Sequence, residues 1–179
     1  MTLRMRFFLI YLILVLGSCN EKVTNKDIIP PLGVSDWENR LVTQSNLDSL
    51  SSGQTYLSVY SEIYINTEKE RIPLGATISI KNPNRNDTIF LTSAEYFETS
   101  GKLVRNYVKS PIYVAPMETI EIVIERLDKE GGSGANFLFD WRKEKQIFDP
   151  IFECLMLSSI GNRSFSFSTH GHNLVTDIP

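Results

Sequence analysis

The sequence predicts an all-β, antiparallel β-sandwich that follows a signal peptide and a polar tether. Three observations support this fold class. Short apolar segments with period-two alternation recur from about residue 53 onward. Turn residues separate these segments at intervals of roughly 8–12 residues, and no segment long enough for a crossover helix lies between them. An immunoglobulin-like sandwich is the favoured version, and a jelly roll or a partly open barrel is the second.

The charge balance bears on the class of partner. The chain has 179 residues, 42% of them hydrophobic, and a formal net charge of −3. Without residues 1–18, which contain Arg4 and Arg6, 16 basic residues stand against 21 acidic ones, a net charge of −5. Binding to a nucleic-acid backbone requires clustered Lys and Arg side chains. The composition therefore argues against nucleic acid as a partner.

The amino terminus has the features of a bacterial lipoprotein signal peptide over residues 1–18. Basic residues precede the apolar run Phe7–Leu16. As a helix this run spans roughly 15 Å, about half of a bilayer core, so it is too short to cross a membrane and suits a signal-peptide core. The sequence Leu-Gly-Ser-Cys follows at Leu16–Cys19 and resembles a lipobox.

The lipobox predicts a membrane anchor at Cys19. Gly17 and Ser18 are small enough to enter a peptidase site in an extended form, and the Cys19 thiol is the group that a diacylglyceryl transferase alkylates. Each buried methylene of acyl chains such as palmitate contributes about 0.8 kcal/mol, so two or three chains hold a protein at a membrane. We expect a lipoprotein of the bacterial cell envelope that faces the periplasm or the cell surface. An ordinary secretory signal with an accidental Cys is the alternative.

Residues 19–52 are predicted to be the lipidated Cys and a polar tether, rich in Asn, Ser, Thr, Asp and Lys. Within the tether, Ser35 and Glu38 have the spacing of a capping box. A short helix is therefore predicted from Asp36, with Trp37 packed on the domain.

The folded domain is predicted over residues 53–179, with about eight strands. Asn82-Pro83-Asn84 and Thr99–Lys102 supply two of the turns that separate them. The predicted strands are residues 55–65, 76–82, 87–98, 102–108, 119–127, 135–141, 151–158 and 164–169.

The two cysteines have separate predicted roles. They are Cys19 and Cys154, and a thioether at Cys19 leaves Cys154 without a partner inside the chain. No disulfide is therefore expected. Because Cys154 lies in an apolar run, we interpret it as a small buried hydrophobe and not as a catalytic thiol.

The segment Gly131–Gly134 has two interpretations. It lacks the Gly-Lys-Ser/Thr ending of a Walker loop and the spacing of a dinucleotide-binding loop. We favour a hairpin-like turn with glycines at positive φ and a hydrogen bond from Asn136 across it. The alternative is a loop that presents successive amides to an anion. The candidate ligand-binding residues are then Gly131, Gly132, Ser133, Gly134, Asn136, Tyr60 and Tyr64.

The strand after this segment carries the largest apolar side chains of the domain. Period-two spacing places Phe137, Phe139 and Trp141 on one face, which we predict to be a core face. Asp140 then lies on the opposite face, exposed or paired with a basic residue such as Arg142.

Three segments together resemble a known bacterial family. They are GQTYLSVYSEIY, EYFETSGKLVRNYV and GGSGANFLFDW, supported by Pro116. They resemble the family called domain of unknown function 3124, from about Gly53 to Leu174. The resemblance implies an envelope lipoprotein or secreted protein, with no known reaction, cofactor or catalytic residues. Glu62 stands where a His is expected, and His170-Gly171-His172 stands where basic residues around the Gly are more usual.

Two function classes remain open. The first is a non-enzymatic, lipid-anchored module that binds a ligand, a carbohydrate or another envelope protein, without a cofactor. In this class Tyr56, Tyr60 and Tyr64, on one face of a strand, form an aromatic platform, although a half-buried strand is the favoured interpretation. The second class is an envelope hydrolase or metal-binding protein that uses His170 and His172. Two His side chains alone are too few for a typical metal site.

Cys19→Ala tests the anchor. We expect the variant to remain an unprocessed and unlipidated precursor, because the alkylated thiol is missing. Electrophoretic size and partitioning into a detergent phase measure both properties, with Cys154→Ala as the matched control. Equal size and equal partitioning of Cys19→Ala and wild type would contradict the prediction.

Overall fold

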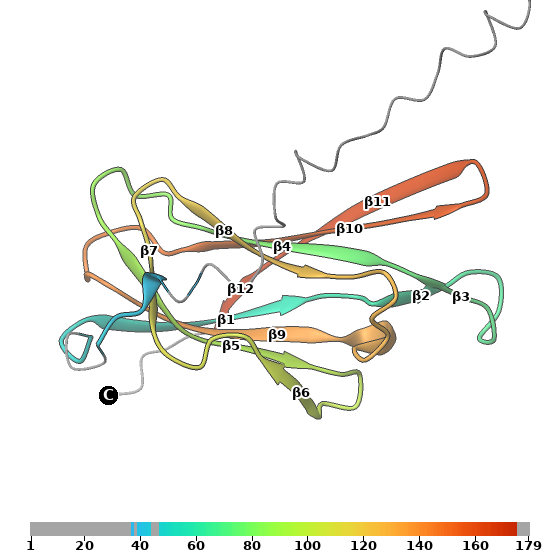
Figure 1. Cartoon of the computed structure of the whole chain (residues 1–179), viewed down its shortest axis with the longest axis horizontal. Helices are drawn as coiled ribbons and strands as arrows, with labels where there is room; N and C mark the ends of the chain where they lie inside the picture. Colours follow the sequence, from blue (N-terminus) through green and yellow to red (C-terminus); the bar gives the residue numbers. More distant parts are fainter. Residues whose placement is uncertain (1–36, 38, 44–46, 175–179) are drawn as a thin grey trace, which may run out of the picture. The chain divides into compact units, whose positions relative to one another are not determined.

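The computed structural model describes residues 37, 39–43 and 47–174. These residues form twelve strands, all of which pair antiparallel, and the all-β antiparallel sandwich is confirmed (Figure 1). The strands are β1 (Ser51–Ser58), β2 (Glu62–Tyr64), β3 (Arg71–Pro73), β4 (Gly75–Lys81), β5 (Ile89–Phe97), β6 (Leu103–Asn106), β7 (Ile112–Val114), β8 (Thr119–Ile124), β9 (Asn136–Lys143), β10 (Ile151–Ile160), β11 (Arg163–His170) and β12 (His172–Leu174). None of the helices in these described ranges is long and apolar enough to span a bilayer.

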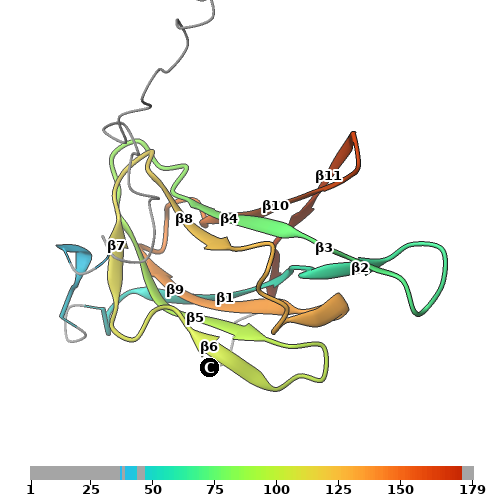
Figure 2. The same cartoon turned by 45° about the vertical axis from the view of Figure 1, so that its right-hand side comes forward.

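Two sheets and a ribbon make up this part of the chain. The larger sheet has the order β12-β1-β9-β5-β6, and β7 also pairs with β5. The smaller sheet has the order β11-β10-β4-β8, and β2 pairs only with β3. Figure 1 shows the sheets as two layers, and Figure 2 shows the β2–β3 ribbon extending past one end of both. The immunoglobulin-like version of the sandwich stays a prediction.

The core lies between the two sheets, where the alternating side chains of both layers meet. In β9, Phe137 and Phe139 are fully buried and Trp141 is nearly so, which confirms the predicted core face. Asp140 lies on the other face and accepts a 2.8 Å hydrogen bond from Gln54 Nε2. Gln54 is its cross-strand neighbour in the register of β1 and β9. Asp140 therefore lies on the predicted opposite face, and its hydrogen-bond partner is Gln54 and not a basic residue such as Arg142.

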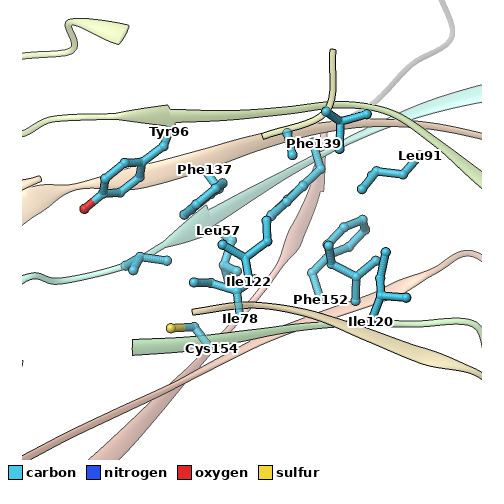
Figure 3. Packing of buried hydrophobic residues seen from close by; sticks show 14 of the residues in the cluster. Leu57, Ile78, Leu91, Tyr96, Ile120, Ile122, Phe137, Phe139, Phe152 and Cys154 are labelled. Carbon is cyan, nitrogen blue, oxygen red and sulfur yellow. The ribbon is translucent and has the colours of Figure 1, made fainter. Parts of the chain in front are cut away.

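Four aromatic rings form a continuous stack through the core. Ring centroids are 4.8 Å apart for Tyr96 and Phe137, 5.2 Å for Phe137 and Phe139, and 4.5 Å for Phe139 and Phe152. Phe152 belongs to β10, so the stack joins the two sheets. Figure 3 shows the row, with the Tyr96 hydroxyl at its outer end. Burial of each ring stabilises the fold by about 1.5–3 kcal/mol.

Cys154 is part of the same core. Its side chain is fully buried in β10, as predicted, and it is a free thiol. Burial raises its pKa to about 12. The thiol therefore stays protonated at neutral pH and behaves as an apolar side chain.

The predicted strand over residues 55–65 is divided in the structure. β1 ends at Ser58, and the chain leaves the larger sheet before β2 begins in the separate ribbon. At the break the Ser61 amide donates a hydrogen bond to the carbonyl of Gly132, and the Leu74 amide donates to the Ser61 carbonyl. Tyr56, Tyr60 and Tyr64 therefore do not share one strand face, so the alternative of an aromatic platform on a single strand was wrong.

The described residues of the predicted tether pack on the domain. Trp37 is 6% exposed within the core cluster, and Leu47 is also buried. The Arg40 guanidinium makes two hydrogen bonds to the Glu118 carboxylate, at 2.8 and 2.6 Å. These contacts lower the pKa of Glu118. Cys19 and the capping-box residues Ser35 and Glu38 lie outside the described residues.

Candidate functional site

The glycine-rich segment forms one wall of a surface cleft of about 430 Å³, which we call the hairpin cleft. Three segments line it: the β2–β3 ribbon, the turn between β5 and β6, and the connection that precedes β9. The ribbon and this connection lie side by side in Figure 1 and Figure 2. The lining residues are Glu62, Tyr64, Arg71, Glu98, Thr99, Ser100, Lys129, Glu130, Gly131, Gly132 and Ser133.

The backbone of the segment differs from the predicted hairpin-like turn. Gly132–Gly134 forms a single 3-10 turn, η3, and within the segment only Gly132 has a positive φ, of 72°. The flanking strands β8 and β9 belong to different sheets. The segment is therefore a crossing between layers, and most of its glycines have ordinary backbone angles.

Hydrogen bonds from the neighbouring turn hold this wall in place. The Thr99 amide donates to the Gly131 carbonyl at 3.0 Å, and the Gly134 amide donates to Thr99 Oγ1 at 2.9 Å. The Gly132 amide donates to the carbonyl of Lys129 at 3.3 Å. Two of the amides that an anion-binding loop would offer are thus already engaged. These bonds favour a structural turn over an anion-binding loop, although the turn does not have the predicted hairpin-like form.

A buried pair of hydroxyl groups lies under Gly131. The Tyr96 hydroxyl and Ser61 Oγ are 2.8 Å apart, and both side chains are fully buried. Burial raises the pKa of Tyr96 to about 12, although the hydrogen bond with Ser61 opposes the shift. A Cβ atom on Gly131 would lie 1.9 Å from the Tyr96 hydroxyl and 2.7 Å from Ser61 Oγ. Glycine is therefore required at residue 131 by close packing and not by its φ.

The ribbon contributes a stacked pair of side chains to the cleft. Tyr64 and Arg71 are opposite one another in the register of β2 and β3. The Arg71 guanidinium carbon lies 4.8 Å from the centroid of the Tyr64 ring, and Tyr64 is 47% exposed. Arg71 also forms an ion pair with Glu62. Its hydrogen bond with that carboxylate raises the pKa of the guanidinium.

The remaining charges of the cleft nearly balance. Glu130 Oε2 accepts a 2.6 Å hydrogen bond from Arg105 Nη2 of β6. Ser100 Oγ donates to Glu98 Oε1 at 2.8 Å. The lining contains three carboxylates, Glu62, Glu98 and Glu130, and two cations, Arg71 and Lys129. Arg105, which is outside the lining but bonded to Glu130, adds a third cation.

The structure brings together only some of the predicted site residues. Tyr64, Gly131, Gly132 and Ser133 line the hairpin cleft. Three others do not line it. Tyr60 packs against Phe167, with 6.1 Å between the ring centroids. Asn136 is the first residue of β9, and the Gly134 amide donates a hydrogen bond to Thr99 Oγ1.

His170 and His172 line a separate cleft of about 350 Å³ beside β10 and β12. His170 Nδ1 lies 3.5 Å from Glu153 Oε1, and the His170 side chain is 68% exposed. Glu153 is also paired with Lys81, whose hydrogen bond lowers the pKa of Glu153. In the part of the chain that the structure describes, no three His, Cys, Asp or Glu residues gather in a way that could hold a metal ion.

Comparison with known proteins identifies the family. Residues 52–174 match the family model described as "Protein of unknown function (DUF3124)", and these residues include the entire lining of the hairpin cleft. The chain belongs to this family. The predicted resemblance is thereby confirmed.

Two further comparisons concern the DUF3124 protein as a whole. It is similar to the solved structure described as "Crystal Structure of Thermotoga maritima 1070", at 10% sequence identity and a TM-score of 0.38. That similarity covers 70% of this chain and 96% of the other. Comparison with curated proteins gives no match.

Gly131→Ala tests the packing of the cleft wall. We expect the free energy of unfolding to fall by about 3 kcal/mol, because the new methyl group displaces the Tyr96 hydroxyl from Ser61. Gly101→Ala is the matched control, since Gly101 has a φ of 84° but open space around its Cβ position. It should cost about 1 kcal/mol of backbone strain. Denaturant unfolding that shows Gly131→Ala to be no more costly than Gly101→Ala would contradict the packing argument.

Proposed function

We propose that this DUF3124 protein is a non-enzymatic binding module of the bacterial cell envelope. In this proposal a lipid on Cys19 holds the chain at the membrane, and the hairpin cleft is the surface that contacts the ligand. The anchor is supported by the short apolar run and lipobox of the sequence.

The single observation that carries the binding proposal is a fixed cleft built from three distant segments. Residues of the β2–β3 ribbon, the turn at 98–100 and the connection at 129–133 converge there. Hydrogen bonds from Thr99 and Ser61 fix the backbone wall. A site that is ordered before the ligand arrives loses less conformational entropy on binding, so its polar groups contribute more to affinity.

The side chains of the cleft favour binding over catalysis. Glu62 is engaged by Arg71, and Glu130 is engaged by Arg105. Both carboxylates are thus held by cations, and the third, Glu98, accepts a hydrogen bond from Ser100 Oγ. The two histidines of the alternative hydrolase lie in the other cleft, beside β12. The arrangement is typical of a recognition surface, in which donors and acceptors are held in fixed directions.

A photo-reactive amino acid at residue 100 tests the cleft as the contact surface. The full chain with p-benzoylphenylalanine in place of Ser100 should form a covalent adduct in irradiated cells, because Ser100 is exposed and lines the cleft. The matched control carries the same group in place of Asn86, an exposed residue of the β4–β5 connection. Mass shifts on immunoblots measure the adducts. Adducts at residue 100 no stronger than at residue 86 would contradict the proposal.

A further inference from the structure

We infer that the hairpin cleft binds the rings of a neutral, hydroxyl-rich oligosaccharide. This inference rests on the proposed function, since it names the ligand class of the same cleft. Three properties of the lining support it: a half-exposed aromatic ring, a mixture of planar donors and acceptors, and a charge close to zero.

Tyr64 supplies the aromatic surface. Tyr64 is 47% exposed and lines the cleft among charged and polar residues, although an aromatic side chain gains most from burial. The guanidinium carbon of its cross-strand neighbour Arg71 lies over one face of the ring, 4.8 Å from the ring centroid. One flat apolar ring in polar surroundings matches a sugar ring, which has a patch of C–H bonds on its face and hydroxyl groups around its edge.

The polar groups match the hydroxyl edge of a sugar. Each sugar hydroxyl donates one hydrogen bond and accepts others, so a complementary site needs donors and acceptors side by side. Glu62 and Arg71 supply them as one ion pair in the ribbon. Planar carboxylate and guanidinium groups present two oxygens or two N–H groups in parallel, which suits a pair of neighbouring hydroxyls. On the turn between β5 and β6, the Glu98 carboxylate and the Ser100 hydroxyl place a further planar acceptor beside a further hydroxyl group.

The charge of the cleft disfavours ionic ligands. With Glu62 paired to Arg71 and Glu130 paired to Arg105, the remaining lining charges, Glu98 and Lys129, have opposite signs. A phosphate or polyanion would meet three carboxylates, and the amides of Gly132 and Gly134 are already engaged. A polycation would meet Arg71 and Lys129. Juxtaposed like charges weaken binding, so a neutral ligand fits best.

Calorimetry on the full chain in lipid nanodiscs tests the ligand class. The neutral probes are chitotetraose, maltotetraose and cellotetraose, and the anionic probes are tetragalacturonate and inorganic phosphate. We expect at least one neutral probe to bind, with an affinity at least tenfold above that of both anionic probes. No binding by any neutral probe, or equal binding by an anionic one, would overturn the inference.

Substitutions of Tyr64 locate the binding. Tyr64→Ala should weaken the neutral probe at least tenfold, whereas Tyr64→Phe, which keeps the ring, should bind within a few-fold of wild type. The matched control is Tyr113→Ala, because the Tyr113 ring also lies under a guanidinium, 5.5 Å from that of Arg40, but outside the cleft. It should bind as wild type does, and melting temperatures establish that all three variants are folded. Unchanged affinity in Tyr64→Ala would overturn the inference.

The two proposals fail in distinguishable ways. A strong adduct at residue 100 to an envelope protein, together with no binding of neutral sugars, overturns the ligand class and leaves the cleft as a contact surface. No adduct at residue 100 and no sugar binding overturn both. An adduct to polysaccharide together with sugar binding lost in Tyr64→Ala supports both.

Discussion

Tyr96 stands at the end of the aromatic stack, and its hydroxyl meets Ser61 Oγ at 2.8 Å where the core ends and the hairpin cleft begins. Both side chains are fully buried, so each group would otherwise leave a polar atom without a partner in the interior. Gly131 packs directly on this pair, with no room for a Cβ atom. The position of the cleft wall therefore depends on the core beneath it, and the core in turn spans both sheets through Phe137, Phe139 and Phe152.

The same residues explain how three separate segments reach one cleft. Ser61 lies between β1 and β2, after the chain has left the larger sheet. Its amide donates a hydrogen bond to the Gly132 carbonyl, and its carbonyl accepts one from the Leu74 amide. That pair of bonds sets the start of the β2–β3 ribbon beside η3. Thr99, in the turn after β5, holds the wall from the other side through hydrogen bonds with the Gly131 carbonyl and the Gly134 amide. The backbone of the cleft is thus held by hydrogen bonds inside the protein, and the side chains of Tyr64, Arg71 and Glu98 line the cleft.

Much of the sandwich could be predicted because long strands with one buried face leave a period-two pattern in the sequence. The β9 aromatic face and the buried Cys154 follow from that pattern. The break after Ser58 could not be predicted, because the alternation of buried side chains continues through Val59 and Ser61 although the chain leaves the sheet. Three-residue strands such as β2 and β12 are too short to show any period.

The residues of the cleft were only partly predictable, because most of them are brought together by tertiary contacts and not by a local sequence pattern. Glycines of the wall are conspicuous in the sequence, but Arg71 and Glu98 have no local signal, since tertiary contacts alone bring them together. Nothing in the sequence indicates that Tyr96 lies under Gly131, which is 35 positions further along the chain. Close packing between residues distant in the chain leaves no local motif in the sequence.

Amide hydrogen exchange in Tyr96→Phe tests the dependence of the cleft wall on the core most directly. This substitution removes the hydroxyl and keeps the ring, so the aromatic stack is preserved while Ser61 loses its partner. Loss of a buried hydrogen bond costs about 1.4 kcal/mol, which corresponds to tenfold faster exchange through local opening. We expect this acceleration at the amides of Gly132 and Gly134, with the amide of Phe139 in the centre of β9 much less affected. Unchanged exchange at both glycines, or equal acceleration at all three amides, would contradict it.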